Sequence, residues 1–266
     1  MRTAYTYNIL QRWIFVVAVF VMIAMNILSG TIPFGGQTMA EVSQNYPTLV
    51  TPAGYAFSIW GLIYLSLAIF AYFQLAKGKR IRFYKLIWPF FLVSAAANIL
   101  WLVAFQNEWF EVSVILIFAL LGSLIFMFRY FYRLKRALST THRYFFQIPF
   151  SLYMGWVSIA SIVNVAVLLT SFEIGFFQEY EQLIAIIMIS IAAILGLWIL
   201  FSQSDYIFNF ALVWGFAAIW VKQDASGVLN ASKFATIGVL LAMIIYFIAD
   251  RIKVSQYGRK TTSQSR

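Results

Sequence analysis

Long runs of apolar residues, separated by short polar segments, recur along the whole chain. A helix needs about 20 apolar residues to cross the hydrocarbon core of a bilayer, whereas a membrane β-barrel shows shorter segments of alternating polarity. The runs predict an all-α integral membrane protein with about eight transmembrane helices. These lie at residues 13–29, 51–74, 86–105, 112–128, 145–170, 183–201, 206–221 and 234–249.

Three of the intervening segments carry expectations of their own. Residues 30–50 form a long connection that contains prolines and glycines, and it is expected to be a lid, a binding loop or disordered. Residues 222–233 are expected to form a polar connector. The polar tail from residue 250 to residue 266 is expected to be disordered beyond its first turn.

The basic residues occur in clusters between the apolar runs. The chain is 62% hydrophobic and 11% charged with a mean hydropathy of +0.83, which excludes a soluble globule. With the N-terminus inside, 17 of the 19 Lys and Arg residues fall on the inner side, and only Lys222 and Lys233 fall outside. This asymmetry follows the positive-inside rule and explains the net charge of +10 without nucleic acid. The expected location is the bacterial cell membrane, with both termini cytoplasmic.

Few residues offer chemistry for catalysis or metal binding. The chain has no cysteine, which excludes disulfides, thiolate catalysis and cysteine-ligated metals. Its single histidine, His142, lies in the basic segment 129–143 and is expected to be a solvated loop residue, not a metal ligand. No ionisable residue lies well inside a predicted span, which argues against an ion-coupled pump. The sequence therefore predicts neither an enzyme nor a bound cofactor.

Aromatic and polar residues form helical stripes on three of the predicted spans. Trp60 and Tyr64 are four residues apart in the uncharged run 51–74, which also carries Tyr55 near its start. Residues spaced by three or four lie on one face of a helix. The same spacing groups Asn98, Trp101 and Phe105 on the third span, and Tyr153, Trp156, Ala160 and Asn164 on the fifth.

These stripes have two interpretations. An asparagine in hydrocarbon needs a hydrogen-bond partner, so Asn98 and Asn164 could be packing contacts between neighbouring helices. Alternatively, they could be the polar points of a pocket with aromatic walls. The spacing of the residues leaves both interpretations open.

The three stripes resemble motifs of the tryptophan-rich sensory protein family, also called the translocator or peripheral-type benzodiazepine receptor family (TspO/MBR). In that family the second span carries Trp-x-x-x-Tyr after a proline-rich entry. The third carries Asn-x-x-Trp with a downstream Phe, and the fifth carries Tyr-x-x-Trp-x-x-x-Ala-x-x-x-Asn. All three motifs occur here in the same order, within roughly residues 13–170. Leu152 stands where the family usually has a proline, and Phe57-Ser58-Ile59-Trp60 replaces Phe-Gly-Pro-Val-Trp.

The resemblance implies a five-helix bundle over residues 1–171. The three spans without a counterpart in that core then form an extension over residues 172–250, followed by a basic cytoplasmic tail over residues 251–266. The family also implies a membrane receptor or sensor, with a transport role, whose cavity opens toward the first loop and holds a hydrophobic ligand such as a tetrapyrrole or a sterol. The candidate ligand-binding residues are Tyr55, Trp60, Tyr64, Asn98, Trp101, Tyr153, Trp156, Ala160 and Asn164. The expected partners are this ligand, membrane lipid and a second copy in a homodimer, but no nucleic acid.

Two other functions stay open. An uncoupled facilitator of a solute or lipid would use all eight spans. A tetrapyrrole-degrading enzyme would need only aromatic residues beside its ligand, although the spans contain no carboxylate pair, metal-ligand cluster or Ser-His-Asp set.

Overall fold

The computed structural model describes residues 8–77, 82–173 and 175–263 as an all-α protein, which confirms the predicted class. Within these residues the chain forms nine α-helices together with the 3₁₀ helices η2 and η4. The elements are α1 (Ile9–Thr31), α2 (Met39–Asn45), η2 (Gly54–Ser58), α3 (Ile59–Lys77), α4 (Arg82–Gln106), α5 (Phe110–Leu134), η4 (Lys135–Ala137), α6 (Thr140–Ser171), α7 (Gly175–Gln203), α8 (Tyr206–Lys222) and α9 (Ser226–Ser263).

Seven of the described helices are long and apolar enough to cross a membrane. They correspond to α1, α3 with η2, α4, α5 with η4, α6, α7 and α9. The eighth predicted run is α8, an apolar helix of 17 residues. At 1.5 Å per residue α8 is about 25 Å long, slightly shorter than a typical hydrocarbon core.

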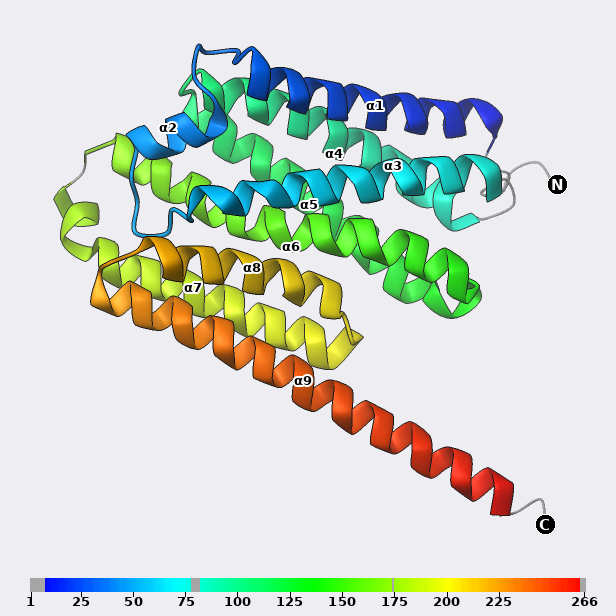
Figure 1. Ribbon diagram of the computed structural model, residues 1–266. Coiled ribbons are helices and arrows are strands. Elements are labelled where there is room, and N and C mark those ends of the chain that lie inside the picture. The colour runs from blue at the N-terminus through cyan, green and yellow to red at the C-terminus, as the bar shows by residue number, and fades with distance from the viewer. Residues whose placement is uncertain (1–7, 78–81, 174, 264–266) are drawn as a thin grey trace.

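The helices form two groups that pack side by side (Figure 1). Helices α1, α3, α4, α5 and α6 form one group, and the short α2 lies across one end of it. In the second group α8 packs between α6 and α9, while α7 contacts α8 and α9. The C-terminal half of α9 extends beyond the bundle.

Glycine residues bring α6 and α8 into close contact. A Cβ atom added at Gly155 would lie 2.6 Å from the carbonyl oxygen of Phe208 and 2.8 Å from Cβ of Ala211. On α8, a Cβ at Gly215 would lie 2.9 Å from Cγ1 of Ile159. Small residues allow membrane helices to approach closely and gain van der Waals contact. The two groups of helices are therefore joined along a tightly packed α6–α8 contact.

The connections contain more helix than the sequence analysis predicts. The segment 30–50 includes α2, which begins at a capping box in which Thr38 and Glu41 bond each other's backbone N–H groups. The expected connector 222–233 is mostly the first turns of α9, which starts at Ser226. The expected disordered tail is wrong for the residues up to Ser263, which continue α9. Extending an existing helix requires no new nucleus, so polar residues can continue it.

The expectation of a solvated loop histidine is also wrong. His142 lies in the first turn of α6, which Ser139 caps, and its ring is half-buried. Its Nδ1 atom is 2.7 Å from the hydroxyl of Tyr84, and its ring contacts Phe73 with a centroid distance of 5.0 Å. The basic segment 129–143 was expected to be a loop because of its charge. Its cationic side chains instead lie in the last turns of α5, in η4 and in the first turn of α6, where long stems can reach the membrane surface.

Candidate functional site

Trp60, in the first turn of α3, lies at the centre of a cluster of aromatic rings. Its ring stacks on that of Tyr64 with a centroid distance of 5.4 Å. The rings of Trp101, Tyr153 and Trp156 lie 6.0, 5.8 and 6.3 Å from it. Offset and edge-to-face contacts at these distances are favourable. The structure thus brings stripes from α3, α4 and α6 together around one indole, and we call these five residues and the cavities beside them the aromatic site.

Hydrogen bonds hold two of these stripes in place. The indole N–H of Trp101 donates to Oδ1 of Asn164 at 2.8 Å, and Nδ2 of Asn164 donates to the hydroxyl of Ser113 at 2.8 Å. Asn98 accepts from Nδ2 of Asn26 on α1 at 2.9 Å. Each bond joins different helices, as the packing interpretation of the asparagines predicts. Both asparagines are buried beside the aromatic rings, so they also set the orientation of the site's walls.

Trp156 differs from Trp101 in having an unpaired donor. Its side chain is 2% exposed, and its Nε1 atom has no hydrogen-bond acceptor within the part of the chain that the structure describes. A buried donor without a partner typically costs about 1–3 kcal/mol. A bound molecule with an acceptor atom could remove this cost.

Two cavities lie beside Trp60. One, of about 30 Å³, is lined by residues that include Trp60, Trp101, Trp156, Ala160 and Asn164. The other, of about 360 Å³, is lined by Trp60, Tyr64 and Trp101 together with residues of α1 and α2. Because Trp60 and Trp101 line both, the aromatic rings separate the two cavities. A change of the Trp60 rotamer would therefore change the volumes of both cavities.

Helix α2 covers the aromatic site. Its Met39 lines both cavities, and Ser43 lines the smaller one. The hydroxyl of Tyr46, at the end of α2, donates to Oε2 of Glu108 at 2.8 Å, and this bond raises the pKa of Tyr46 above its ordinary value. The tether to Glu108 connects α2 to the turn between α4 and α5. This arrangement makes the first loop a lid over the site.

Tyr55 lies apart from the other candidate residues. It is 46% exposed, and its ring packs edge-to-face on Trp214 of α8 at a centroid distance of 5.3 Å. Trp214 also donates from Nε1 to the carbonyl oxygen of Ala56 at 3.0 Å. Tyr55 therefore belongs to the contact between η2 and α8.

Comparison with models of protein families identifies the family of this chain. A family model described as TSPO-like protein matches residues 12–248. The chain belongs to the TSPO-like protein family. No curated protein and no solved structure matches significantly. Since the match continues to residue 248, it includes α7, α8 and most of α9 as well as the helices that carry the motifs.

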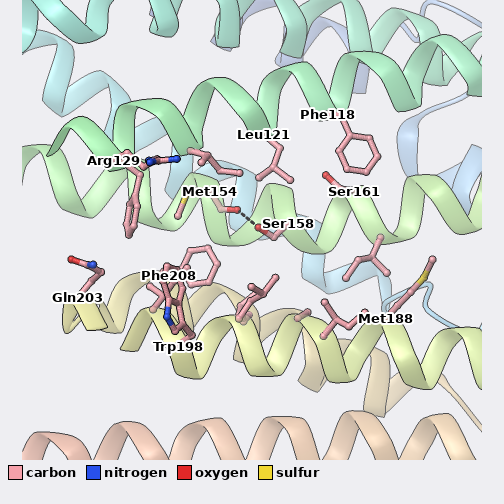
Figure 2. A pocket seen from close by; sticks show the side chains of 18 of the residues that line it. Phe118, Leu121, Arg129, Met154, Ser158, Ser161, Met188, Trp198, Gln203 and Phe208 are labelled. Atoms are coloured by element: carbon pink, nitrogen blue, oxygen red, sulfur yellow. Dashed lines mark hydrogen bonds between the residues drawn. The ribbon is translucent and has the colours of Figure 1, made fainter. Parts of the chain in front are cut away.

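This TSPO-like protein has a further cavity, larger than the two beside Trp60, that the sequence did not predict. It lies between α5 and α6 on one side and α7 and α8 on the other, and its volume is about 980 Å³ (Figure 2). We call it the lateral groove. Its lining comes from residues such as Leu121, Met154, Met188 and Leu212, which carry no motif. Only their apolar character was visible in the sequence, and any lipid-facing residue shares it.

A buried carboxylate next to the groove was also missed. Asp205 is fully buried just before α8, in the short segment that separates two predicted apolar runs. It accepts hydrogen bonds from the hydroxyls of Tyr132 and Ser151 and from the backbone N–H groups of Ile207 and Phe208. An aspartate just before an apolar run is a helix N-cap signal, so its capping role was readable. Its bonds to α5 and α6 depend on tertiary packing.

Proposed function

We propose that this TSPO-like protein is a membrane receptor or sensor that binds a tetrapyrrole or sterol in the aromatic site and can move this ligand across the lid. The observation that carries the proposal is the cluster around Trp60, which separates two cavities beneath α2. The larger cavity, of about 360 Å³, lies within the range of about 300–1,000 Å³ typical of small-molecule sites. Movement of Trp60 would add space for a large planar ligand.

The polar chemistry of the site supports a binding role. Trp156 offers a buried donor, and the Tyr64 hydroxyl lies beside Asn26 and Asn98. These few polar groups among aromatic walls can orient a mostly apolar ligand. Among the described residues, no group of three or more His, Cys, Asp or Glu could hold a metal ion. We propose that the donor of Trp156 and the hydroxyl of Tyr64 orient a ligand during binding and release.

Ala160→Leu tests the proposal. Ala160 lines the smaller cavity, so the added methylenes should displace ligand or strain the wall, at about 1.4 kcal/mol or a tenfold loss of affinity. Affinity for protoporphyrin and for cholesterol is measured by tryptophan fluorescence titration of the purified protein. Ala119→Leu is the matched control, because Ala119 is exposed on α5. Equal affinities in the two variants, or no binding of either probe by the wild type, would contradict the proposal.

The alternative is an uncoupled facilitator that uses all eight spans. The aromatic site and the lateral groove are lined by different faces of α6, Trp156 and Ala160 on one side and Met154 and Ser158 on the other. A solute that moved through both cavities would have to cross the packed helix α6. This obstacle argues against a continuous transport path and favours the receptor. Flux of solute through the purified protein in proteoliposomes, unaffected by Ala160→Leu, would favour the facilitator instead.

We also propose a topology of eight spans, counting α8, with both termini cytoplasmic and the three last helices added to a five-helix bundle. The start of α1 and the end of α9 lie toward the same end of the bundle, which supports this topology (Figure 1). Single cysteines replacing the exposed residues Gln44 and Gln178 should react with an impermeant thiol reagent in intact cells, whereas one replacing exposed Thr141 should not. Reaction at Thr141 from outside would overturn the topology.

A further inference from the structure

We propose that the lateral groove binds one anionic diacyl phospholipid of the surrounding bilayer, with the headgroup at Arg129 and Arg133 and the acyl chains along α5, α6 and α7. This is a second site, and it does not rest on ligand binding at the aromatic site. It assigns a specific role to the space between the two groups of helices.

The groove has the size and the wall chemistry for acyl chains. Its volume of about 980 Å³ is at the upper end of the range of roughly 300–1,000 Å³ for small-molecule sites. Along α5 it reaches from Phe118 to Arg133, which corresponds to about 22 Å at 1.5 Å per residue. That exceeds the thickness of one leaflet, roughly half of the 30 Å hydrocarbon core. A lipid of one leaflet therefore fits along it.

The groove is accessible from the membrane. Phe118, Ile191, Leu195 and Trp198, which line it, are each exposed over half or more of their surface. Large exposed apolar side chains on a membrane-spanning helix are typical of a surface that faces lipid, so the groove opens toward the bilayer. A lipid could enter from the side, without crossing the lid formed by α2.

The cationic residues of the groove lie at one end. Figure 2 shows Arg129 and Gln203 near one end of the groove and Phe118 and Met188 near the other. Arg133 follows Arg129 by one turn of α5, and both side chains are exposed. No ion pair to either arginine is found within the described residues. Arginine binds phosphate oxygens through paired N–H groups, so this end matches a phospholipid headgroup.

The nearby carboxylate does not cancel this charge. Asp205 is fully buried, and its oxygens already accept four hydrogen bonds, one of them from the hydroxyl of Tyr132. Lys135 adds another cation at this end, with Nζ 4.3 Å from the centre of the Tyr132 ring. The net charge of the side chains at this end of the groove is therefore positive. In the proposed topology it faces the cytoplasmic leaflet, where anionic lipids concentrate.

A second copy of the chain is a weaker occupant than a lipid. A two-fold interface places the same patch on both partners, so two grooves that face each other in one membrane would bring their Arg129 and Arg133 side chains together. Like charges at that depth repel. A lipid headgroup neutralises them, and flexible acyl chains can fill a hollow that a second helical surface would leave open.

The test counts the lipids bound to the purified full chain by native mass spectrometry. Protein in detergent is mixed with equal amounts of phosphatidylglycerol and phosphatidylcholine that have matched acyl chains. We expect one retained phosphatidylglycerol, with at least tenfold preference over phosphatidylcholine. In the double variant Arg129→Gln/Arg133→Gln the preference should fall at least fivefold. Arg136→Gln, a charge change at an exposed residue outside the groove lining, should keep the wild-type preference.

A groove-filling variant tests the position of the acyl chains. Ser158 lines the groove and its hydroxyl bonds the carbonyl of Met154 at 2.8 Å (Figure 2). Ser158→Phe should reduce retention of both lipids at least fivefold. Ser190 makes the same kind of bond, to Ile186 at 2.7 Å, but is exposed outside the groove lining, so Ser190→Phe should retain lipid like the wild type. Thermal melting in detergent confirms that each variant is folded.

Three results would overturn the proposal. The first is a phosphatidylglycerol preference in Arg129→Gln/Arg133→Gln equal to that of Arg136→Gln. The second is equal lipid retention in Ser158→Phe and Ser190→Phe. The third is a lipid-free dimer of the wild type that Ser158→Phe converts to monomer, because the groove would then be an interface between copies.

Discussion

The aromatic site and the lateral groove lie on different faces of α6 and fill the space between helices differently. At the aromatic site, rings around Trp60 and hydrogen bonds through Asn164 leave cavities of only about 30 and 360 Å³. At the groove, apolar side chains leave about 980 Å³, and the arginines lie at one end. The first arrangement suits a ligand that must match a defined shape. The lateral groove suits flexible acyl chains, which need only apolar contact along their length and a cationic residue for the headgroup.

This difference follows from how the helices meet. At the aromatic site, stripes on α3, α4 and α6 converge, so large rings fill the centre. At the groove, α8 is drawn against α6 by Gly155 and Gly215, while α7 stays farther from α5. Because α6 and α8 pack closely while α7 and α5 do not, the lateral groove is left open between them. Substitutions at one of the two sites should therefore leave the other unchanged.

The largest effect is expected at the α6–α8 contact. In Gly155→Ala the new Cβ would lie 2.6 Å from the backbone oxygen of Phe208, so a helix must move, and we expect a loss of about 3 kcal/mol in the free energy of unfolding. Gly122→Ala is the control, because nothing lies within 4 Å of its added Cβ. That change should raise stability by about 0.5–1 kcal/mol. Thermal melting in detergent measures both, and a shift in the same direction would show that the close contact is unimportant.

A smaller effect is expected when the centre of the aromatic site is removed. Trp60→Ala takes away the ring that contacts four other aromatic residues, so protoporphyrin affinity should fall about 30-fold, or about 2 kcal/mol. Lipid retention in the groove should stay at the wild-type level. Fluorescence titration and native mass spectrometry measure the two properties. Parallel losses of both would mean that the two sites are coupled through α6.

Asp205→Asn should have a moderate effect on stability. Asn keeps the shape but removes the charge that strengthens the hydrogen bonds from Tyr132 and Ser151, so we expect a loss of about 1.5 kcal/mol in unfolding free energy. Protoporphyrin affinity should not change, because Asp205 lies outside the aromatic site. A matched control is Asp224→Asn, which alters an exposed residue after α8. Equal melting curves for the two variants would contradict the role of Asp205 in joining the helix groups.

The smallest effect is expected from Trp156→Phe. This variant removes the unpaired Nε1 donor and keeps an aromatic ring, so affinity for a ligand with an acceptor atom should fall about fivefold, or about 1 kcal/mol. Without ligand, stability should change little, because the gain from removing the unpaired buried donor offsets the packing lost with the larger ring. In Trp101→Phe, by contrast, Asn164 loses its donor, and stability itself should fall. Equal thermal shifts for the two variants would contradict the distinction between these indoles.

The sequence predicted the helical class and much of the aromatic site for a definite reason. An apolar run long enough to span a bilayer must form a helix, because in hydrocarbon the backbone N–H and C=O groups can bond only to each other. Spacings of three and four placed Trp60 with Tyr64 and Trp156 with Asn164. The stripes then converged in the structure because helices that bury polar and aromatic faces must direct them at one another.

The errors arose where charge was taken as a sign of loop. His142, the connector 222–233 and the tail up to Ser263 are helical because the neighbouring turns extend through them. Tyr55 lies on Trp214 because η2 turns the chain toward α8 before α3 begins. The position of Tyr55 depends on a residue that is distant in the sequence, and the helical segments depend on the turns that precede or follow them.

By itself, the sequence determined the helical class and the approximate positions of the apolar helices, because a long apolar run is a local property. Only the tertiary structure decided which faces of α5, α6, α7 and α8 meet, and so it alone revealed the groove and the bonds of Asp205. Such a meeting depends on where a glycine permits close approach and where a large side chain prevents it. In a membrane, lipid and protein surfaces are both apolar, so the pattern of apolar residues along a helix does not record which of the two it will face.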